Sequence, residues 1–218
     1  MKRQRAIKEE HKLERKQVIL TTALQIFKNA SYNEVTMSAV ARKARLAKGT
    51  LFLYFPTKEE MFLALMEGQL IEWFDGVDAA FDSLKGKSSI TAVVALFVNS
   101  LKERVEFTRL LAIHSTILEQ NVSYESIFKY KQIIMQRLAG TGAQLEKSLP
   151  FLKAGQGAHI ILQCQALVVG LWHLTDPSPT ACKVIEKEVL TAFKLDFNIE
   201  FQDILTSLLY GIEKQSQS

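Results

Sequence analysis

The fold of this 218-residue chain is decided by residues 36–60, which read TMSAVARKARLAKGTLFLYFPTKEE. Apolar side chains recur at helical spacing from Met37 to Ala44, and Thr36 stands where a hydroxyl can cap the first turn. After the turn at 45–47, a second short helix is expected over Lys48–Tyr54, with Leu51 and Phe55 facing inward. The stretch therefore predicts two short helices joined by a tight turn.

The segments on both sides of this pair are also predicted to be helical. Upstream, apolar residues recur at helical intervals between Lys8 and Asn29. Downstream, Pro56 ends the second short helix, and Thr57 with Glu60 three residues later forms a capping-box pattern. A long helix is expected from there to about residue 84.

The remainder of the chain shows helical periodicity and no sustained alternation typical of strands. Helices are expected over about 88–102, 105–119, 123–147, 158–174, 183–193 and 199–213, with a loop at Asp176–Pro179. We therefore predict an all-α protein, with an N-terminal three-helix domain over residues 1–57 and a helical bundle over residues 58–218.

Charge is divided unevenly between these two parts. The whole chain has a net charge of +4, but residues 1–58 carry 13 basic and 4 acidic side chains, whereas residues 59–218 carry 14 and 19. A basic head on an acidic body indicates a polyanionic partner at one end. Seven of the basic residues lie within residues 1–16. That segment is either an arm that reaches phosphates or a minor groove, or a solvated leader.

Signals for export or membrane insertion are not expected. The first 20 residues are too charged for the apolar core of a signal peptide. The most apolar run, residues 158–174, is interrupted by polar side chains that disfavour a membrane span. Cys164 and Cys182 have no CxxC partner, so they predict neither a disulfide framework nor a metal site. We expect a cytoplasmic protein without a cofactor.

Three short helices in a basic head, the last two joined by a tight turn, suggest a helix-turn-helix whose second helix can lie in a DNA major groove. The order of residues is more specific. The runs ALQIF (23–27), TMSAVA (36–41) and KGTLFLYFPTKEEMF (48–62), with Tyr32 between the first two, resemble the DNA-binding signature of the TetR family of transcriptional regulators. The resemblance covers about residues 15–65. It implies a helix-turn-helix DNA-binding domain followed by a helical ligand-binding and dimerisation domain.

The resemblance and the helix geometry together imply DNA-binding roles for ten residues. Lys48, at the start of the recognition helix, is expected to meet a phosphate or a guanine, and Gly49 lets the backbone approach closely. The full set is Thr36, Ser38, Arg45, Lys48, Gly49, Thr50, Phe52, Leu53, Tyr54 and Lys58. The alternatives are a packed aromatic ring for Tyr54 and a lysine paired with a nearby glutamate for Lys58.

Several positions depart from the family's pattern. Ser31 and Arg45 stand where glycines are usual, and Ala47 replaces a capping Ser or Thr worth about 1 kcal/mol. Phe52 and Leu53 cannot hydrogen-bond a base edge and can only touch thymine methyl groups or exclude mismatched shapes. We therefore expect a DNA site that is read partly through apolar contacts and DNA shape.

A helix-turn-helix of this kind reads one half-site, so a homodimer on a palindromic double-stranded DNA operator is expected. Residues 158–174 are apolar nearly all round, and residues 199–213 carry a broad apolar stripe. The resemblance implies a four-helix dimer interface built from these two helices of each subunit. The alternative is a monomeric bundle.

The resemblance also implies a small-molecule pocket in the second domain. Candidate lining residues are large aromatics and isolated polar groups on apolar helices: Trp73, Phe97, His114, Phe128, Gln163 and Trp172. Each of these side chains is also compatible with a place in an ordinary core. The apolar surroundings favour a small hydrophobic effector, which no residue pattern identifies.

These observations favour a transcriptional repressor that a small hydrophobic ligand releases from its operator. An enzyme is not expected, because the chain lacks metal-spaced His and Glu sets, a phosphate-binding glycine loop and a nucleophile signature. The alternative is a helical interaction protein with a degenerate DNA-binding head, which the departures at Ala47, Phe52 and Leu53 would allow.

Overall fold

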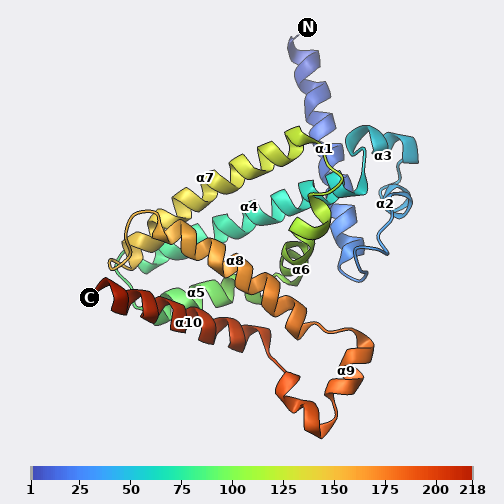
Figure 1. Ribbon diagram of the computed structural model, residues 1–218. Coiled ribbons are helices and arrows are strands. Elements are labelled where there is room, and N and C mark those ends of the chain that lie inside the picture. Colours follow the sequence, from blue (N-terminus) through green and yellow to red (C-terminus); the bar gives the residue numbers. More distant parts are fainter. Residues whose placement is uncertain (1, 218) are drawn as a thin grey trace. The chain divides into compact units, whose positions relative to one another are not determined.

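The computed structural model describes residues 2–217, while the side chains of residues 2–9 and 188–189 lie outside the description, and with them part of the predicted arm at 1–16. The described residues form helices and no strand, which confirms the all-α prediction (Figure 1). The elements are α1 (Lys2–Phe27), α2 (Met37–Lys43), α3 (Lys48–Tyr54), α4 (Lys58–Leu84), α5 (Ile90–Lys102), α6 (Val105–Ile113), the π-helical turn η1 (His114–Leu118), α7 (Tyr124–Ser148), α8 (Gln156–Thr175), α9 (Pro179–Ile185), the 3-10 segment η2 (Glu188–Phe193) and α10 (Phe197–Ser216).

The chain divides into two compact units. The first comprises the residues up to Gly68 together with His114–Ile127, and the second comprises Gln69–Ile113 with Phe128–Ser218. The expected domain boundary between residues 57 and 58 coincides with the start of α4. The first unit extends beyond it because the first turn of α4 is hydrogen-bonded to residues 121–126.

Three helices of the first unit enclose a small apolar core, in which α2 packs against both α1 and α3. The buried side chains come from all three helices: Ile19, Ala23, Phe27, Val40 and Leu51. Phe55, which directly follows α3, is also buried. The burial of Leu51 and Phe55 confirms the predicted inward face of the second short helix.

Local signals determine both ends of α2. Thr36 Oγ1 accepts a hydrogen bond from the Ala39 N–H at 3.1 Å, which confirms the predicted cap. At the other end, the Arg45 N–H donates to the Arg42 carbonyl at 3.2 Å, and the Leu46 N–H donates to the Ala41 carbonyl at 2.9 Å. This is a Schellman pattern. Arg45 occupies its left-handed position with a φ of 56°, where glycine is usual, and the chain turns sharply into α3.

Three local predictions are wrong. Thr57 caps α4 through the Glu60 N–H at 3.0 Å, but the Glu60 carboxylate does not complete a capping box, because it binds Ser123 and Ser126. The helix expected over 105–119 changes at His114 to the π-helical turn η1. The helix expected over 183–193 is instead two short segments, α9 and η2.

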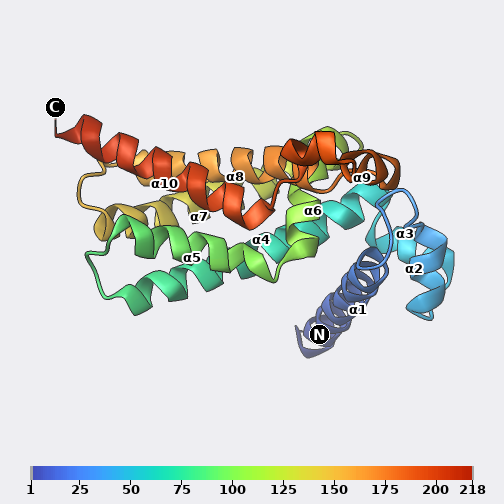
Figure 2. The same cartoon turned by 90° about the horizontal axis from the view of Figure 1, so that it is seen from below.

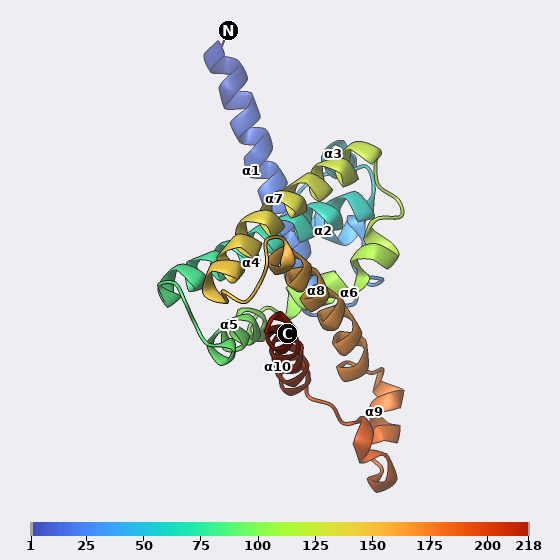
Figure 3. The same ribbon diagram turned by 60° about the vertical axis from the view of Figure 1, so that its left-hand side comes forward.

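The second unit is a helical bundle in which α8 packs against α6 and α10, and α10 packs against α5 (Figure 2). Side-chain bonds join α7 to α4, since Arg137 Nη2 lies 2.5 Å from Asp75 Oδ1 and the Thr141 hydroxyl donates to Asp78 at 2.6 Å. Figure 3 shows α9 in the connection that leaves the end of α8 and returns to α10.

Helix α8 is the most apolar long helix of the described chain. By length and composition alone it could cross a membrane, with a mean hydropathy of 1.3, although we expected its polar residues to disfavour this. One such helix is weak evidence, because the core helix of a bundle passes the same test. Here its buried side chains, which include Ile161, Cys164 and Val168, face other helices of the second unit.

Candidate functional site

One face of α3 is open to solvent. Lys48 and Gly49 are exposed, and the side chains of Phe52 and Leu53 are 39% and 83% exposed. Leu51, on the opposite face, is fully buried. Because helical residues four apart lie one above the other, Lys48 shares a face of α3 with Phe52, and Gly49 shares it with Leu53. The Lys48 Nζ lies 5.9 Å from the centroid of the Phe52 ring, so a cation and an aromatic ring stand together on this face.

Gly49 leaves the start of α3 unobstructed. A Cβ atom added at this position would meet nothing within 4 Å in the described part of the chain. Packing inside the protein therefore does not require a glycine here. The missing side chain allows another molecule to approach the backbone of α3 closely.

Polar and basic residues surround the exposed face of α3. Thr36 and Ser38 lie exposed at the start of α2, whose N-terminal N–H groups favour anions. Arg45 is exposed in the turn that leads into α3, while Thr50 and Tyr54 are half-buried on α3 itself. The structure therefore brings nine of the ten predicted DNA-binding residues to the α2–α3 pair.

The tenth residue, Lys58, points into the head instead. Its Nζ donates to the carbonyl of Tyr32 and lies 3.8 Å from the centre of the Tyr32 ring. Burial lowers the pKa of Lys58, and the charge of Glu59 opposes that shift. The Tyr32 hydroxyl donates to Glu59 Oε1 at 2.7 Å, and its pKa is raised by burial and by this carboxylate. Lys58 would have to leave this cluster to reach a phosphate.

Two glutamates in the first turn of α4 accept hydrogen bonds from residues 121–126, the segment that leads into α7. We did not predict these bonds. Glu59 Oε2 accepts from Asn121 Nδ2 at 3.2 Å. Glu60 accepts from the Ser123 N–H and from the Ser126 hydroxyl, both at 2.7 Å. These partners are more than 60 residues apart in sequence, so periodicity could not pair them. The sequence indicated only that Ser123 could cap the start of α7, and its hydroxyl does accept a hydrogen bond from the Ser126 N–H.

His114, a predicted pocket residue, belongs to this first unit. It is buried, and its Nε2 lies 3.3 Å from Glu119 Oε1. The Glu119 N–H also donates to the His114 carbonyl at 3.2 Å, which is the five-residue spacing of a π-helical turn. The side chain therefore supports η1 and does not line the cavity of the second unit.

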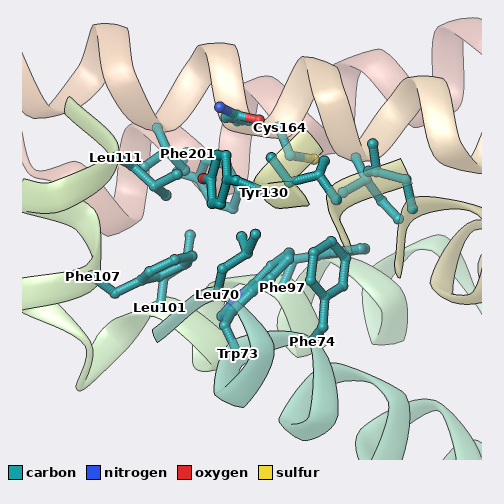
Figure 4. Close-up of a pocket in the computed structure, with 15 residues that line it drawn as sticks. Leu70, Trp73, Phe74, Phe97, Leu101, Phe107, Leu111, Tyr130, Cys164 and Phe201 are labelled. Atoms are coloured by element: carbon teal, nitrogen blue, oxygen red, sulfur yellow. The ribbon is translucent and has the colours of Figure 1, made fainter. Parts of the chain in front are cut away.

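A cavity of about 40 Å³ lies inside the second unit (Figure 4). Its walls come from α4, α5, α6, α7, α8 and α10 and consist mainly of aromatic and aliphatic side chains. Trp73 and Phe97, both predicted, line it with their ring centroids 6.4 Å apart. Trp73 also stacks on Phe107 at 5.7 Å, and its Nε1 donates to the Ser100 hydroxyl at 3.0 Å.

The polar groups of the cavity wall are few, and apart from the Trp73 indole N–H, which donates to Ser100, they lie on three side chains. They belong to Tyr130, Cys164 and Gln165. Burial raises the pKa of the Cys164 thiol to about 12, so it stays protonated. A volume of about 40 Å³ has room for roughly three water molecules. Pockets for drug-sized ligands enclose about 300–1,000 Å³, so such a ligand would require the walls to move.

The other predicted pocket residues of the second unit lie elsewhere. Phe128 is 51% exposed on α7. Gln165 of α8 faces the cavity, and Gln163 points about 160° away from it around the same helix. Gln163 therefore lines a groove between α8 and α10 instead of the cavity. Trp172 packs edge-on against Phe197, with 6.4 Å between the ring centroids.

Helices α8 and α10 pack against each other and also expose apolar side chains. The exposed set is Leu162, Leu174, Ile199, Ile204 and Tyr210. Exposed apolar groups on two adjoining helices are typical of a surface that another protein surface covers. Among the described residues, no cluster of three His, Cys, Asp or Glu side chains could hold a metal ion.

A basic head whose second short helix presents an open face, joined to a helical bundle with an apolar cavity, defines a helix-turn-helix protein of the two-unit type. Residues 19–65 match the family described as "Bacterial regulatory proteins, tetR family", and residues 67–216 match "Tetracyclin repressor-like, C-terminal domain". The chain belongs to the TetR family.

Relatives share parts of the sequence. The transcriptional repressor KstR of Mycolicibacterium smegmatis is 36% identical over 69 residues, which are 32% of each chain. The fatty acid metabolism regulator protein of Bacillus subtilis is 24% identical over 123 residues, which are 56% of this chain and 59% of the relative. The chain thus spans less than two thirds of the length of these curated relatives.

The fold is similar to that of solved structures. The fatty acid degradation regulator FadR from Bacillus halodurans superimposes with a TM-score of 0.51 and 16% identity, over 88% of this chain and 94% of that one. At this identity the likeness shows a shared fold.

Proposed function

We propose that this protein is a sequence-specific DNA-binding transcriptional regulator. The observation that carries the proposal is the open face of α3, formed by Lys48, Gly49, Phe52 and Leu53. In helix-turn-helix proteins the second helix enters a major groove about 12 Å wide and reads base edges from its N-terminal part. Membership of the TetR family supports this function.

The residues on this face suggest what kind of half-site it reads. Lys48 can donate to the O6 and N7 atoms of a guanine, whereas Phe52 and Leu53 can make only apolar contacts, for which the thymine methyl group is the partner. Replacing thymine by uracil throughout the half-site removes those methyl groups and should weaken binding. Unchanged affinity for the uracil duplex would contradict this part of the proposal.

The residues around the face are proposed to bind the DNA backbone. Thr36, Ser38, Arg45, Thr50 and Tyr54 offer hydroxyl groups and one charge beside α3. Contacts to phosphates position a protein on the duplex without reading its sequence.

We further propose a homodimer that binds a palindromic operator. The exposed apolar side chains of α8 and α10 would be covered by the same helices of a second copy. Two half-sites would then lie about 34–36 Å apart, which is one turn of DNA. Sedimentation equilibrium should give twice the chain mass, and a monomer across the working concentrations would contradict the dimer.

The cavity is proposed to take a small hydrophobic effector that releases the protein from its operator in the cytoplasm. Its uncharged aromatic wall suits an apolar molecule, and the name of the Bacillus subtilis relative associates that protein with fatty acid metabolism. Coupling between effector and DNA is of the order of 1–3 kcal/mol, or about 5–150-fold in affinity. The protein with the effector in its cavity should therefore bind the operator more weakly than the protein without it.

The test uses purified protein and a randomised pool of duplexes. Wild-type protein should retain DNA and enrich one sequence. Lys48→Ala should lose that enrichment, whereas Lys28→Ala, which removes an equal charge at an exposed position directly after α1, should keep it. Equal enrichment by the wild type and Lys48→Ala would contradict the role of the α3 face.

A second candidate is a helical interaction protein with a degenerate head. It is favoured by Ala47, which provides no side-chain cap for α3, and by the exposed, apolar Leu53. This candidate requires the wild-type protein to retain no DNA even at low salt.

A further inference from the structure

The first half of α1 lies outside the core of the head. Within its described side chains, residues 10–18 are exposed apart from the half-buried Lys16, and Ile19 is the first buried apolar residue. In Figures 1 and 3 this part of α1 runs on beyond α2 and α3. A short helical segment without packing partners is marginal in water. A partner outside the chain would stabilise it.

Two lysines and two glutamates of this segment lie on two different faces, and the exposed Arg15 lies between these faces. Lys12 and Lys16 are one helical turn apart and share a face. Glu10 and Glu14 share another face, about 160° away at 3.6 residues per turn. Glu14 lies 3.3 Å from His11 on its own side of the helix. In the sequence, Lys8 continues the four-residue spacing of Lys16 and Lys12 and Arg5 follows three residues earlier, with Glu9 three residues before Lys12 on the same side; the side chains of residues 5–9 lie outside the described part.

The basic face adjoins the recognition helix. Lys16 Nζ lies 5.5 Å from the centroid of the ring of Phe55, the residue that directly follows α3. The row of lysines therefore begins beside α3 and follows α1 away from it. The acidic row, with Glu10 and Glu14, lies on the far side.

We propose that this basic face of α1 is a second DNA-binding surface, which contacts the phosphates of base pairs flanking the half-site that α3 reads. The inference rests on the proposed function. The 12 residues from Arg5 to Lys16 span about 16 Å of helix, the length of roughly five base pairs. Lysine acts on phosphates as a point charge, so the surface adds affinity and salt dependence without sequence preference.

The test compares charge changes on the two faces of one helix. Lys12→Gln with Lys16→Gln removes two positive charges, and the control, Glu10→Gln with Glu14→Gln, changes the net charge by the same amount in the opposite direction on the other face. Each protein is titrated with the selected operator alone and with the same operator carrying about five extra base pairs on each side. Fluorescence anisotropy over a range of salt concentrations gives the slope of log affinity against log salt.

On the flanked duplex, the lysine variant should lose about two units of salt slope per head, because each lost phosphate contact removes about 0.9. On the bare operator it should match the wild type, and the glutamate variant should keep the wild-type slope on both. Lys12→Gln alone should lose about one unit, which guards against any change at Phe55 caused by Lys16→Gln.

Equal slopes for the wild type and the lysine variant on the flanked duplex would overturn the second surface and leave the proposed function standing. An equal loss on both duplexes would also overturn it, because the lysines would then act inside the half-site. A wild-type protein that binds no DNA would overturn both proposals.

Discussion

Replacing Arg45 by glycine should make the protein more stable and at the same time a weaker DNA binder. Arg45 has a φ of 56° and is held there by two backbone bonds of 3.2 and 2.9 Å that close α2. In this left-handed conformation a residue with a Cβ costs about 1 kcal/mol more than glycine. For a chain of about this length, 1 kcal/mol corresponds to roughly 2–4 °C in Tm. Scanning calorimetry measures that rise.

The same substitution removes one proposed phosphate contact per head. The salt slope of operator binding should therefore fall by about one per head, and affinity should fall equally for all sequences. Lys85→Gly is a matched control, because Lys85 has a φ of 53° and lies in the second unit. It should raise Tm by a similar amount and leave DNA binding unchanged.

Two results would contradict these roles of Arg45. If Lys85→Gly raises Tm and Arg45→Gly does not, the left-handed backbone at Arg45 carries no strain that glycine relieves. If Arg45→Gly binds the operator with the wild-type salt slope, its guanidinium does not contact a phosphate.

Three further outcomes are expected. Gly49→Ala should keep or raise Tm, because the added Cβ meets nothing within 4 Å and alanine is the better helix former, but it should weaken operator binding about tenfold by blocking close approach; equal affinity would argue against a contact at Gly49. A thiol reagent at neutral pH should modify the exposed Cys182 quickly and reach Cys164 only on unfolding, because burial raises the pKa of Cys164 to about 12; two fast thiols would contradict this. Burial raises the pKa of Glu59, but hydrogen bonds, including one from Tyr32, lower it overall, so its stabilisation is present above the pKa of a free glutamate and lost as the pH falls through the lowered value. Glu59→Gln should accordingly lose less free energy of unfolding than the wild type on acidification, as measured by denaturant unfolding. Parallel curves of stability against pH for the two proteins would contradict this role of Glu59.

Features that depend on near neighbours in the sequence could be predicted. The cap at Thr36, the inward positions Leu51 and Phe55, and the missing cap at Ala47 all follow from helical spacing and local hydrogen-bonding chemistry. The open face of α3 follows in the same way, since it is the side opposite the buried residues.

Features that depend on distant partners could not be predicted. Glu60 satisfies the rule for a capping box, yet its carboxylate finds the Ser123 N–H, which lies 63 residues away. From its place in the first turn of a helix, Lys58 was expected to contact a phosphate. In the structure its Nζ donates to the Tyr32 carbonyl and lies over the Tyr32 ring. Periodicity contains no information about such pairs.

The cavity wall shows a third kind of limit. Helix α8 is apolar nearly all round, so its sequence does not distinguish the side that faces the cavity from the side that faces outward. Gln163 was predicted to line the pocket, whereas Gln165, two positions later, is the glutamine in its wall. Only the packing of α8 against α6 and α10 decides between them.

Selection of duplexes from a random library by the purified wild-type protein is the decisive measurement. A dimer that reads DNA through α3 should enrich an inverted repeat whose half-sites lie one helical turn, about 34–36 Å, apart. No enrichment at low salt, or enrichment of a single site without symmetry, would contradict a dimeric regulator that reads DNA through α3.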